Sequence, residues 1–197
     1  MGLEDLLVFG GTFDPVHNGH LIVARAVAEQ RGFGRVVLIP AAAPPHKPGP
    51  AATGPQRLEM LQAAVAGEAL FEVCDLELHR SGPSYTIDTV NALQEGAGNA
   101  LRIHLLIGTD MLRELPSWHR VAELLERAEI LTALRRSDPA EPDDPLAALE
   151  GAFSAEQLSR LRAGLAATPR VDISSTELRQ RVRAGWSVRY LVPDAVA

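Results

Sequence analysis

Short apolar runs alternate along the chain with longer stretches in which apolar residues recur at helical spacing. The short runs are bounded by Gly, Pro or charged residues, which is typical of buried strands. They predict strands at residues 6–9, 36–39, 71–78, 102–107, 130–134 and 171–173. The stretches between them predict helices at residues 21–30, 55–66, 85–94, 117–127, 154–166 and 175–184.

This alternation predicts an α/β fold: a Rossmann-like, doubly wound parallel sheet with helices on both faces and a small C-terminal helical part. The length of 197 residues fits a single domain over residues 1–197. Residues 137–144 are rich in Pro and acids and predict an exposed loop inside that domain. Because such sheets bind ligands at the carboxyl ends of their strands, we expect the chemistry to follow Phe9, Ile39, Ile107 and Ile173.

The charge balance narrows the class of partner. The chain has 19 basic and 25 acidic residues, a net charge of −6, which argues against a nucleic-acid-binding surface but not against a small phosphate ligand. The single cysteine, Cys74, forms no internal disulfide and indicates a reducing compartment. The first residues lack the basic start of a signal peptide, and no apolar run is as long as a membrane span. We therefore expect a cytoplasmic protein with no membrane contact.

The most specific pattern, GGTFDPVHNGH, occupies residues 10–20 at the turn after the first predicted strand. Gly10 and Gly11 let the backbone approach a ligand closely, and backbone N–H groups at the start of the following helix form an anion site. His17 and His20 add two imidazoles that can serve phosphate oxygens as hydrogen-bond donors or as cations. The segment therefore predicts a phosphate site.

Asp14, His17 and His20 also raise the alternative of an iron or zinc site, since two His and one carboxylate form a known ligand set. Pro15 and Gly19 interrupt any helix that would align the three side chains. We therefore expect no metal held by protein ligands.

A second polar cluster, ISSTELR, lies at residues 173–179, where the last predicted helix begins. Ser174, Ser175 and Thr176 offer hydroxyl and backbone donors at the positive end of the helix dipole. Arg179 lies one turn farther along and can donate two hydrogen bonds to a phosphate. A helix cap beside a solvated Arg has the same pattern, so this motif alone is a weak signal.

Together the two segments resemble the signatures of the nicotinate mononucleotide adenylyltransferases, in the order expected for that family. The intervening segments PPHK, SYTIDT, LLIGTD and PSWHR resemble its bacterial members; they occupy residues 44–47, 84–89, 105–110 and 116–120. The first signature is shared with a wider superfamily, including pantetheine-phosphate and glycerophosphate transferases. SYTIDT and SWHR narrow the resemblance to the pyridine-nucleotide branch.

The resemblance implies transfer of AMP from ATP to nicotinate mononucleotide, with release of pyrophosphate, as a step of NAD biosynthesis. It implies that His17, His20 and Arg179 are catalytic, with His20 nearest the transferring phosphorus. The further ATP-binding residues it implies are Gly10, Gly11, Thr12, Phe13, Gly108, Asp110, Ser174, Ser175 and Thr176. Mg²⁺ is expected to arrive with ATP and to make few protein contacts.

Four residues are candidates for binding the mononucleotide. The resemblance implies that Lys47 meets its phosphate. A helix starting at Ser117 would present Trp118 and His119 in its first turn, where unpaired backbone N–H groups can bind a carboxylate. Trp118 would also stack on the pyridinium ring, and Thr86 would add a hydroxyl. On this argument the acid acceptor is preferred over the amide.

Three other functions stay open on the sequence alone. The same chemistry could act on nicotinamide mononucleotide or phosphopantetheine. The chain could instead be a non-catalytic nucleotide sensor, although the presence of His17, His20 and Arg179 counts against this. A fragment of a class I aminoacyl-tRNA synthetase is disfavoured by the short chain and by the lack of a basic face. The sequence does not predict the oligomeric state.

Overall fold

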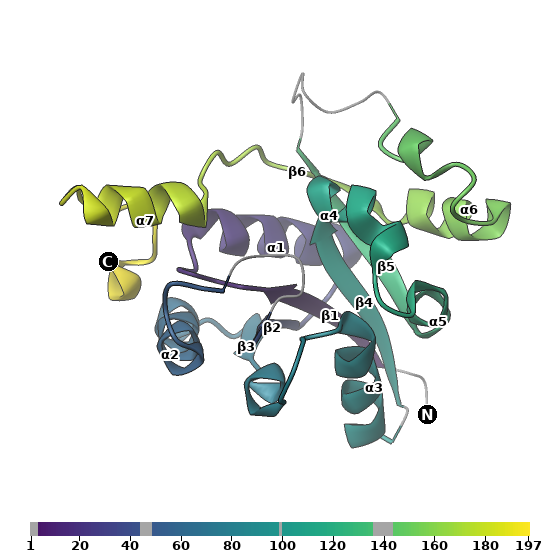
Figure 1. Ribbon diagram of the computed structural model, residues 1–197, viewed down its shortest axis with the longest axis horizontal. Coiled ribbons are helices and arrows are strands. Elements are labelled where there is room, and N and C mark those ends of the chain that lie inside the picture. Colours follow the sequence, from purple (N-terminus) through teal and green to yellow (C-terminus); the bar gives the residue numbers. More distant parts are fainter. Residues whose placement is uncertain (1–3, 44–48, 99, 136–143) are drawn as a thin grey trace.

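A six-stranded parallel sheet forms the centre of the computed structural model, which describes residues 4–43, 49–98, 100–135 and 144–197 (Figure 1). The strand order is β3-β2-β1-β4-β5-β6. The strands are β1 (Glu4–Gly11), β2 (Val36–Pro40), β3 (Phe71–Val73), β4 (Leu101–Gly108), β5 (Ala128–Arg135) and β6 (Leu165–Thr168). Strands β2 and β3 lie on one side of β1, and β4, β5 and β6 lie on its other side. The switch point therefore lies between the carboxyl ends of β1 and β4.

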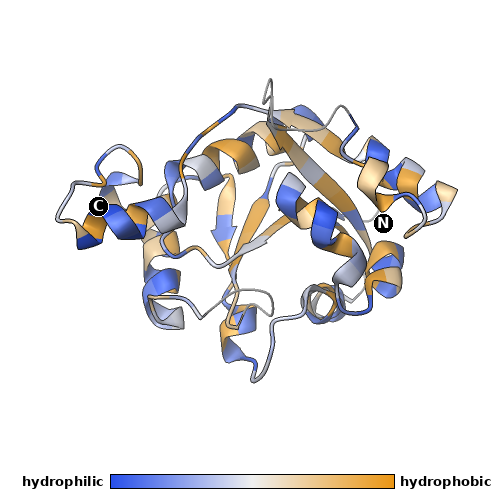
Figure 2. Cartoon of the chain, turned by 45° about the horizontal axis from the view of Figure 1, so that its top comes forward, coloured by the Kyte–Doolittle hydropathy of each residue, from blue (hydrophilic) through white to orange (hydrophobic). Residues whose placement is uncertain are grey.

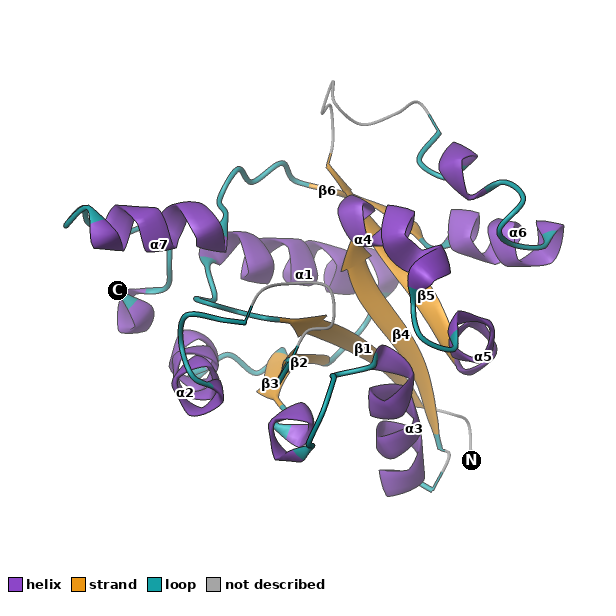
Figure 3. Ribbon diagram, in the orientation of Figure 1, coloured by secondary structure: helices purple, strands orange, loops and turns teal. Residues whose placement is uncertain are grey.

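Helices cover both faces of this sheet (Figure 3). In the described part of the chain the α-helices are α1 (Asn18–Arg31), α2 (Gly54–Val65), α3 (Thr86–Gly96), α4 (Thr109–Glu114), α5 (Val121–Arg127), α6 (Ala155–Ala163) and α7 (Ser175–Arg183). Residues of α3, α4, α5 and α6 share one buried cluster with the sheet, and residues of α1 and α2 share the other. The predicted doubly wound sheet is confirmed.

The two clusters explain why the central strands read as continuous apolar runs. Leu6 and Val8 of β1 lie in one cluster and Leu7 lies in the other, because successive strand residues face opposite sides. All five residues of β2 are buried for the same reason. Figure 2 shows much of the sheet in the hydrophobic colour, interrupted by hydrophilic segments, whereas the helices carry both colours throughout.

The strand predicted at residues 171–173 is wrong. The sixth strand is β6, which begins at Leu165, inside the helix predicted at residues 154–166, and runs on to Thr168. Helix α6 ends where Gly164 meets the backbone of β5: a Cβ atom at Gly164 would lie 2.0 Å from the carbonyl oxygen of Ile130. The Leu-Ala-Ala run after Gly164 continues an Ala-rich helical pattern, so composition alone does not mark this boundary.

Two other elements are shorter than predicted. The strand predicted at residues 71–78 ends at Val73 and is followed by a 3₁₀ turn, η1 (Leu76–His79). The helix predicted at residues 117–127 is wrong in its first turn: α4 leads into a 3₁₀ turn, η2 (Leu115–Ser117), and α5 begins only at Val121. Arg120, before α5, has a left-handed backbone with φ 52°, which interrupts any continuous helix there.

The C-terminal part lies beside the sheet. Helix α7 projects beyond the sheet in Figure 1, and the chain then folds back through a last 3₁₀ turn, η4 (Asp194–Val196). Val192 is buried and Val196 packs against the cluster that contains α2. The predicted loop at residues 137–144 lies almost wholly outside the described residues. No helix in the described ranges is long and apolar enough to cross a membrane.

Candidate active site

The turn after β1 is shaped by Gly11 and Phe13. Phe13 has a left-handed backbone with φ 49°, and its side chain is buried. A Cβ atom at Gly11 would lie 3.1 Å from the Phe13 ring, so a glycine lets the ring fold under the strand end. The Phe13 side chain therefore belongs to the core, and only its backbone faces the turn.

His17 and His20 cap each other at the start of α1. The Nδ1 atom of His17 accepts a hydrogen bond from the backbone N–H of His20 at 3.3 Å, and the Nδ1 atom of His20 accepts one from His17 at 3.2 Å. Their rings are stacked with centroids 3.6 Å apart. An Nδ1 atom that accepts a hydrogen bond carries no proton, so a neutral ring in this arrangement carries its proton on Nε2. Both rings are thereby oriented as Nε2–H donors.

Burial decides between the two roles that the sequence left open for His17. Its side chain is largely buried, and this desolvation lowers the pKa of His17 from 6.5 to about 4. His17 is therefore neutral near pH 7, and its Nε2–H is available as a hydrogen-bond donor rather than as part of a cation.

The Asp14 carboxylate is hydrogen-bonded to the backbone of another loop. It accepts hydrogen bonds from the backbone N–H groups of Ala51 at 2.7 Å and Ala52 at 3.0 Å, which fixes the loop before α2. Coordination of a metal by His17 and His20 would break their reciprocal cap, because each Nδ1 atom already accepts a hydrogen bond and each neutral ring carries its proton on Nε2. Among the described residues, no group of three or more His, Cys, Asp or Glu side chains is arranged to hold a metal ion.

A buried arginine that the sequence analysis missed supports the same turn. Arg57 of α2 is 1% exposed and donates a 2.7 Å hydrogen bond to the carbonyl oxygen of Thr12. Burial lowers the pKa of Arg57, whereas the charge of Asp14 raises it. Arg57, Leu61 and Val65 are the buried residues of α2 and recur every four positions. That spacing placed Arg57 on the apolar face of the helix and could have revealed it.

The second motif docks directly onto the first. Ser174 caps α7 by accepting a hydrogen bond from the N–H of Glu177, and the Ser175 hydroxyl donates to the carbonyl oxygen of Pro15 at 2.9 Å. Arg179 donates to the carbonyl oxygen of Asp14 at 2.6 Å and to the Thr176 hydroxyl at 3.2 Å. The hydroxyls and guanidinium of α7 therefore lie beside the His17–His20 turn.

The C-terminal segment also contacts this turn. The backbone N–H of Asn18 donates to the carbonyl oxygen of Leu191 at 3.0 Å, and its side-chain amide donates to that of Tyr190 at 2.8 Å. The N–H groups of Asn18 and His20 are therefore both bonded within the protein, and the anion site predicted at the start of α1 has two donors fewer than expected.

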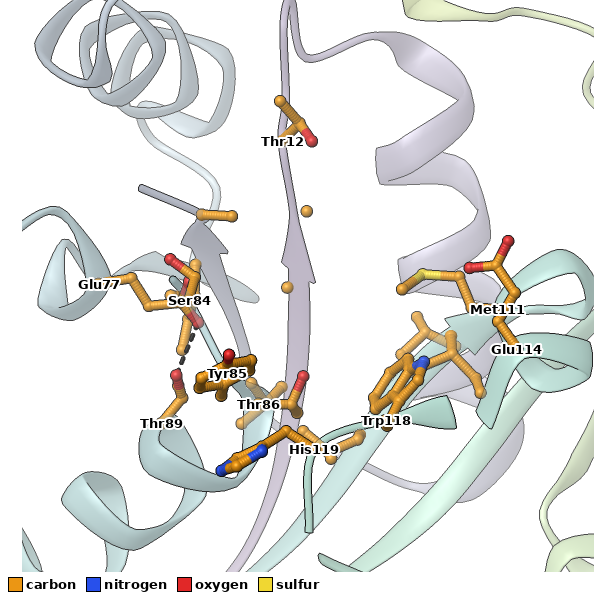
Figure 4. Close-up of a pocket in the computed structure, with 18 of the residues that line it drawn as sticks. Thr12, Glu77, Ser84, Tyr85, Thr86, Thr89, Met111, Glu114, Trp118 and His119 are labelled. Carbon is orange, nitrogen blue, oxygen red and sulfur yellow. Dashed lines mark hydrogen bonds between the residues drawn. The ribbon is translucent and has the colours of Figure 1, made fainter. Parts of the chain in front are cut away.

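A cavity of about 170 Å³ lies beside the turn, at the switch point between β1 and β4 (Figure 4). Predicted site residues from separate elements line it: Gly10, Gly11, Thr12, Thr86, Asp110, Trp118 and His119. Gly108 caps α4 just behind it, and a Cβ atom there would lie 2.6 Å from the Asp110 carboxylate, so glycine lets that side chain turn back toward the strand end. Lys47 lies outside the described residues.

Trp118 and His119 reach the cavity by a different route from the one predicted. They lie between η2 and α5, not in the first turn of a helix, and the N–H of Trp118 donates to the carbonyl oxygen of Leu115 at 3.0 Å. That donor is occupied, so the predicted carboxylate site on unpaired helix N–H groups is wrong. Trp118 is 9% exposed, both core and cavity wall, and its indole Nε1–H has no partner among the described residues.

The opposite wall contains residues that the sequence analysis did not assign to the site. The Tyr85 ring stacks on that of His119 with centroids 4.2 Å apart, and Figure 4 shows the two side by side. Glu77 and Thr89 also line this side of the cavity. No residue pattern places Glu77 beside α3, because the contact depends on how η1 packs on that helix.

Comparison with known proteins agrees with this architecture. The sequence profile of the cytidylyltransferase-like family matches residues 8–181. A relative in Serratia proteamaculans, named a "probable nicotinate-nucleotide adenylyltransferase", is 43% identical over 96% of this chain and 89% of its own length. A relative with the same name in Gloeobacter violaceus is 41% identical over 98% and 91%. The chain belongs to the nicotinate-nucleotide adenylyltransferase family.

Solved structures of this family share the fold. The nicotinic acid mononucleotide adenylyltransferase of Plasmodium falciparum, solved with NaAD, superimposes with a TM-score of 0.73 at 17% identity, over 98% of this chain and 93% of that protein. At this identity the likeness shows the fold alone. Family membership rests on the sequence relatives, and the predicted nucleotidyltransferase activity, in NAD biosynthesis, agrees with their names.

Proposed function

We propose that the chain transfers AMP from ATP to nicotinate mononucleotide in the cavity between β1 and β4, giving nicotinate adenine dinucleotide and pyrophosphate. The names of the relatives support the reaction, and the Plasmodium relative was solved with NaAD. The observation that carries the assignment to this site is the docking of Ser175 and Arg179 on the Asp14–Pro15 backbone. It joins two polar motifs into one site beside a cavity.

The triphosphate is assigned to the polar end of this site. His17 and His20 donate from Nε2, Gly10, Gly11, Thr12 and Phe13 approach through their backbone, and Ser174, Ser175, Thr176 and Arg179 hold the β- and γ-phosphates. The Nε2 donors of His17 and His20 and the Arg179 guanidinium, held before the substrate arrives, stabilise charge without reorganising. Asp110, beside Gly108, is assigned to the adenosine ribose.

The reaction needs no protein base. The attacking oxygen belongs to a phosphate with a second pKa near 6, so it is already largely dianionic at pH 7. It forms a bond to the α-phosphorus, and the bond from that phosphorus to the β-phosphate bridging oxygen breaks, so pyrophosphate leaves with the electron pair. The protein positions two polyanions and stabilises the leaving charge.

Mg²⁺ would enter with ATP as part of the substrate and would neutralise part of the phosphate charge. Asp14 is committed to Ala51 and Ala52, so this carboxylate is not assigned as a ligand. Magnesium makes few protein contacts when phosphates supply its oxygens, which fits this arrangement. The whole chain, residues 1–197, is proposed to act as one cytoplasmic domain, in keeping with its single Cys74.

The acceptor is assigned to the aromatic end of the cavity. Trp118, His119 and Thr86 line it, and Lys47 is proposed to meet the mononucleotide phosphate. The indole N–H of Trp118, which has no partner in the part of the chain that the structure describes, offers a donor to a polar acceptor group. Tyr85 and His119 form a stacked pair beside it. These features favour a flat aromatic acceptor over the flexible chain of phosphopantetheine.

The deciding experiment is an acceptor panel. The purified chain is incubated with Mg²⁺-ATP and, separately, nicotinate mononucleotide, nicotinamide mononucleotide or phosphopantetheine, and pyrophosphate release is measured. The proposal expects the highest kcat/KM with nicotinate mononucleotide. Turnover only with another acceptor would replace the substrate, and binding of ATP without turnover of any acceptor would indicate a nucleotide sensor.

A further inference from the structure

A buried polar network lies in the cavity wall formed by η1 and α3. The Thr89 hydroxyl donates to the Glu77 carboxylate at 2.7 Å, and the Arg80 guanidinium donates to the same hydroxyl oxygen. Arg80 also stands 3.8 Å from the Glu77 carboxylate. Glu77 and Thr89 line the cavity, and Figure 4 shows Glu77 and Thr89 joined across its left wall.

Burying this network costs more free energy than a purely structural contact requires. Glu77 is 7% exposed and Thr89 is 3% exposed. A buried carboxylate loses hydration that its partners only partly restore, and apolar side chains of similar volume often stabilise a fold at least as well. Arg80 adds a further cost in free energy, because its buried Nε atom has no partner among the described residues. A network of this cost beside the cavity points to a role in the site.

Thr89 connects the network to the acceptor end of the cavity. It lies one helical turn after Thr86, on the same face of α3. The residues just before α3 hold two neighbours in place: Ser84 accepts hydrogen bonds from the N–H groups of Ala42 and Ala43, and Tyr85 stacks on His119. A shift of the first turn of α3 would therefore move Tyr85, Thr86 and His119 together.

We propose that Glu77 is a positioning residue that, through Thr89 and with Arg80, fixes the first turn of α3 and so sets the shape of the acceptor end of the cavity. The inference rests on the proposed function in assigning that end to the mononucleotide. Neither Glu77 nor Thr89 is required to touch the reacting atoms.

Substitutions of Thr89 test the network with little change of volume. Thr89→Val removes the hydroxyl and is expected to raise KM for nicotinate mononucleotide about tenfold, because a hydrogen bond to a charged group is lost. KM for ATP is expected to stay within about twofold of the wild-type value. Thr89→Ser keeps the hydroxyl and is expected to restore KM to near the wild-type value. A Thr89→Val enzyme that is less stable but has both KM values unchanged would reduce the network to a structural role and overturn the proposal.

Asp75→Asn is the matched control. Asp75 immediately precedes the same η1 turn and its carboxylate pairs with His79 at 2.8 Å, but it does not line the cavity. Its substitution is expected to leave both KM values unchanged, and an equal rise in KM for the mononucleotide would overturn the specific role of Glu77. Glu77→Gln, which keeps an acceptor for Thr89, is expected to raise this KM less than Glu77→Ala does; the reverse order would also contradict the proposal.

Amide hydrogen exchange provides a readout that does not depend on activity. In the ligand-free protein, Thr89→Val is expected to speed exchange of the amides of residues 87–90 relative to wild type and Thr89→Ser. Unchanged exchange would show that the network does not hold α3. If the wild-type enzyme turned over no mononucleotide, the proposed function would fail, while the exchange result would still decide the positioning role.

Discussion

His17 and His20 act as one unit because each caps the backbone of the other. The two Nδ1 atoms are bound to the partner's N–H, and Phe13 lies edge-on to His20 with centroids 5.1 Å apart. Neither ring can turn without breaking a cap, so the Nε2–H groups keep their direction. Donors fixed in this way stabilise transition-state charge more effectively than mobile ones.

His20→Ala is expected to fold and to lose about 10²- to 10³-fold in kcat, on the scale of a deleted transition-state donor. Steady-state kinetics with Mg²⁺-ATP and nicotinate mononucleotide, together with circular dichroism of the variant, measure the two effects separately. A kcat close to wild type would remove His20 from the chemistry and leave it as a helix cap.

Stability should fall in acid because of His17. Its pKa is about 4 in the folded protein and 6.5 in the unfolded chain, so between these values the unfolded chain binds the extra proton. The stabilisation is fully present above pH 6.5 and is lost as the pH falls toward 4, to a total on the order of 3 kcal/mol. His17→Asn keeps a helix cap without this titration. Urea unfolding at pH 7 and 4.5 is expected to show a smaller acid loss in the variant, and equal losses would contradict the burial argument.

At the scale of elements, the sequence predicted what a strand or helix reveals by its own pattern. β1, β2, β4 and β5 are apolar on both faces and were recognisable, as was α7 from its capping Ser174. β6 was not, because Leu165–Thr168 extends a helical composition and only the neighbouring β5 makes it a strand. The η2–α5 boundary was missed because the left-handed Arg120 leaves no mark in the sequence.

The boundary between α6 and β6 yields a stability prediction. At Gly164→Ala the new methyl would meet the backbone carbonyl of Ile130, which no side-chain rotation relieves, so a loss of roughly 2 kcal/mol or more is expected. Gly96→Ala is the control: Gly96 ends α3 with no atom within 4 Å of an added Cβ, and this change is expected to be neutral or to stabilise by about 0.5–1 kcal/mol. Equal unfolding midpoints for the two variants would mean that β5 and β6 are less closely packed than the structure indicates.

At the scale of the whole molecule, the site depends on contacts between segments far apart in the chain. Arg179 binds the carbonyl of Asp14, the carbonyl of Leu191 binds Asn18, and Arg57 binds that of Thr12. The two polar motifs were visible in the sequence, but their docking was not, nor was the buried Glu77. Such contacts depend on how helices pack on the sheet, and local patterns do not encode that.

This docking leads to a test of what Arg179 does. In Mg²⁺-free buffer, ATP and nicotinate adenine dinucleotide should each raise Tm. A ligand at about 100 times its Kd adds about 2.7 kcal/mol to the free energy of unfolding, which raises Tm by roughly 5–10 °C for a chain of this size. If Arg179 grips the β- and γ-phosphates, Arg179→Ala should lose much of the shift caused by ATP. It should keep the shift caused by the dinucleotide, which contains neither of the phosphates that leave as pyrophosphate. Thermal scans of wild type and Arg179→Ala at equal ligand concentrations distinguish these two roles. An equal loss of the Tm shift for the two ligands would mean that Arg179 acts through Asp14, by holding the turn, rather than on the leaving phosphates.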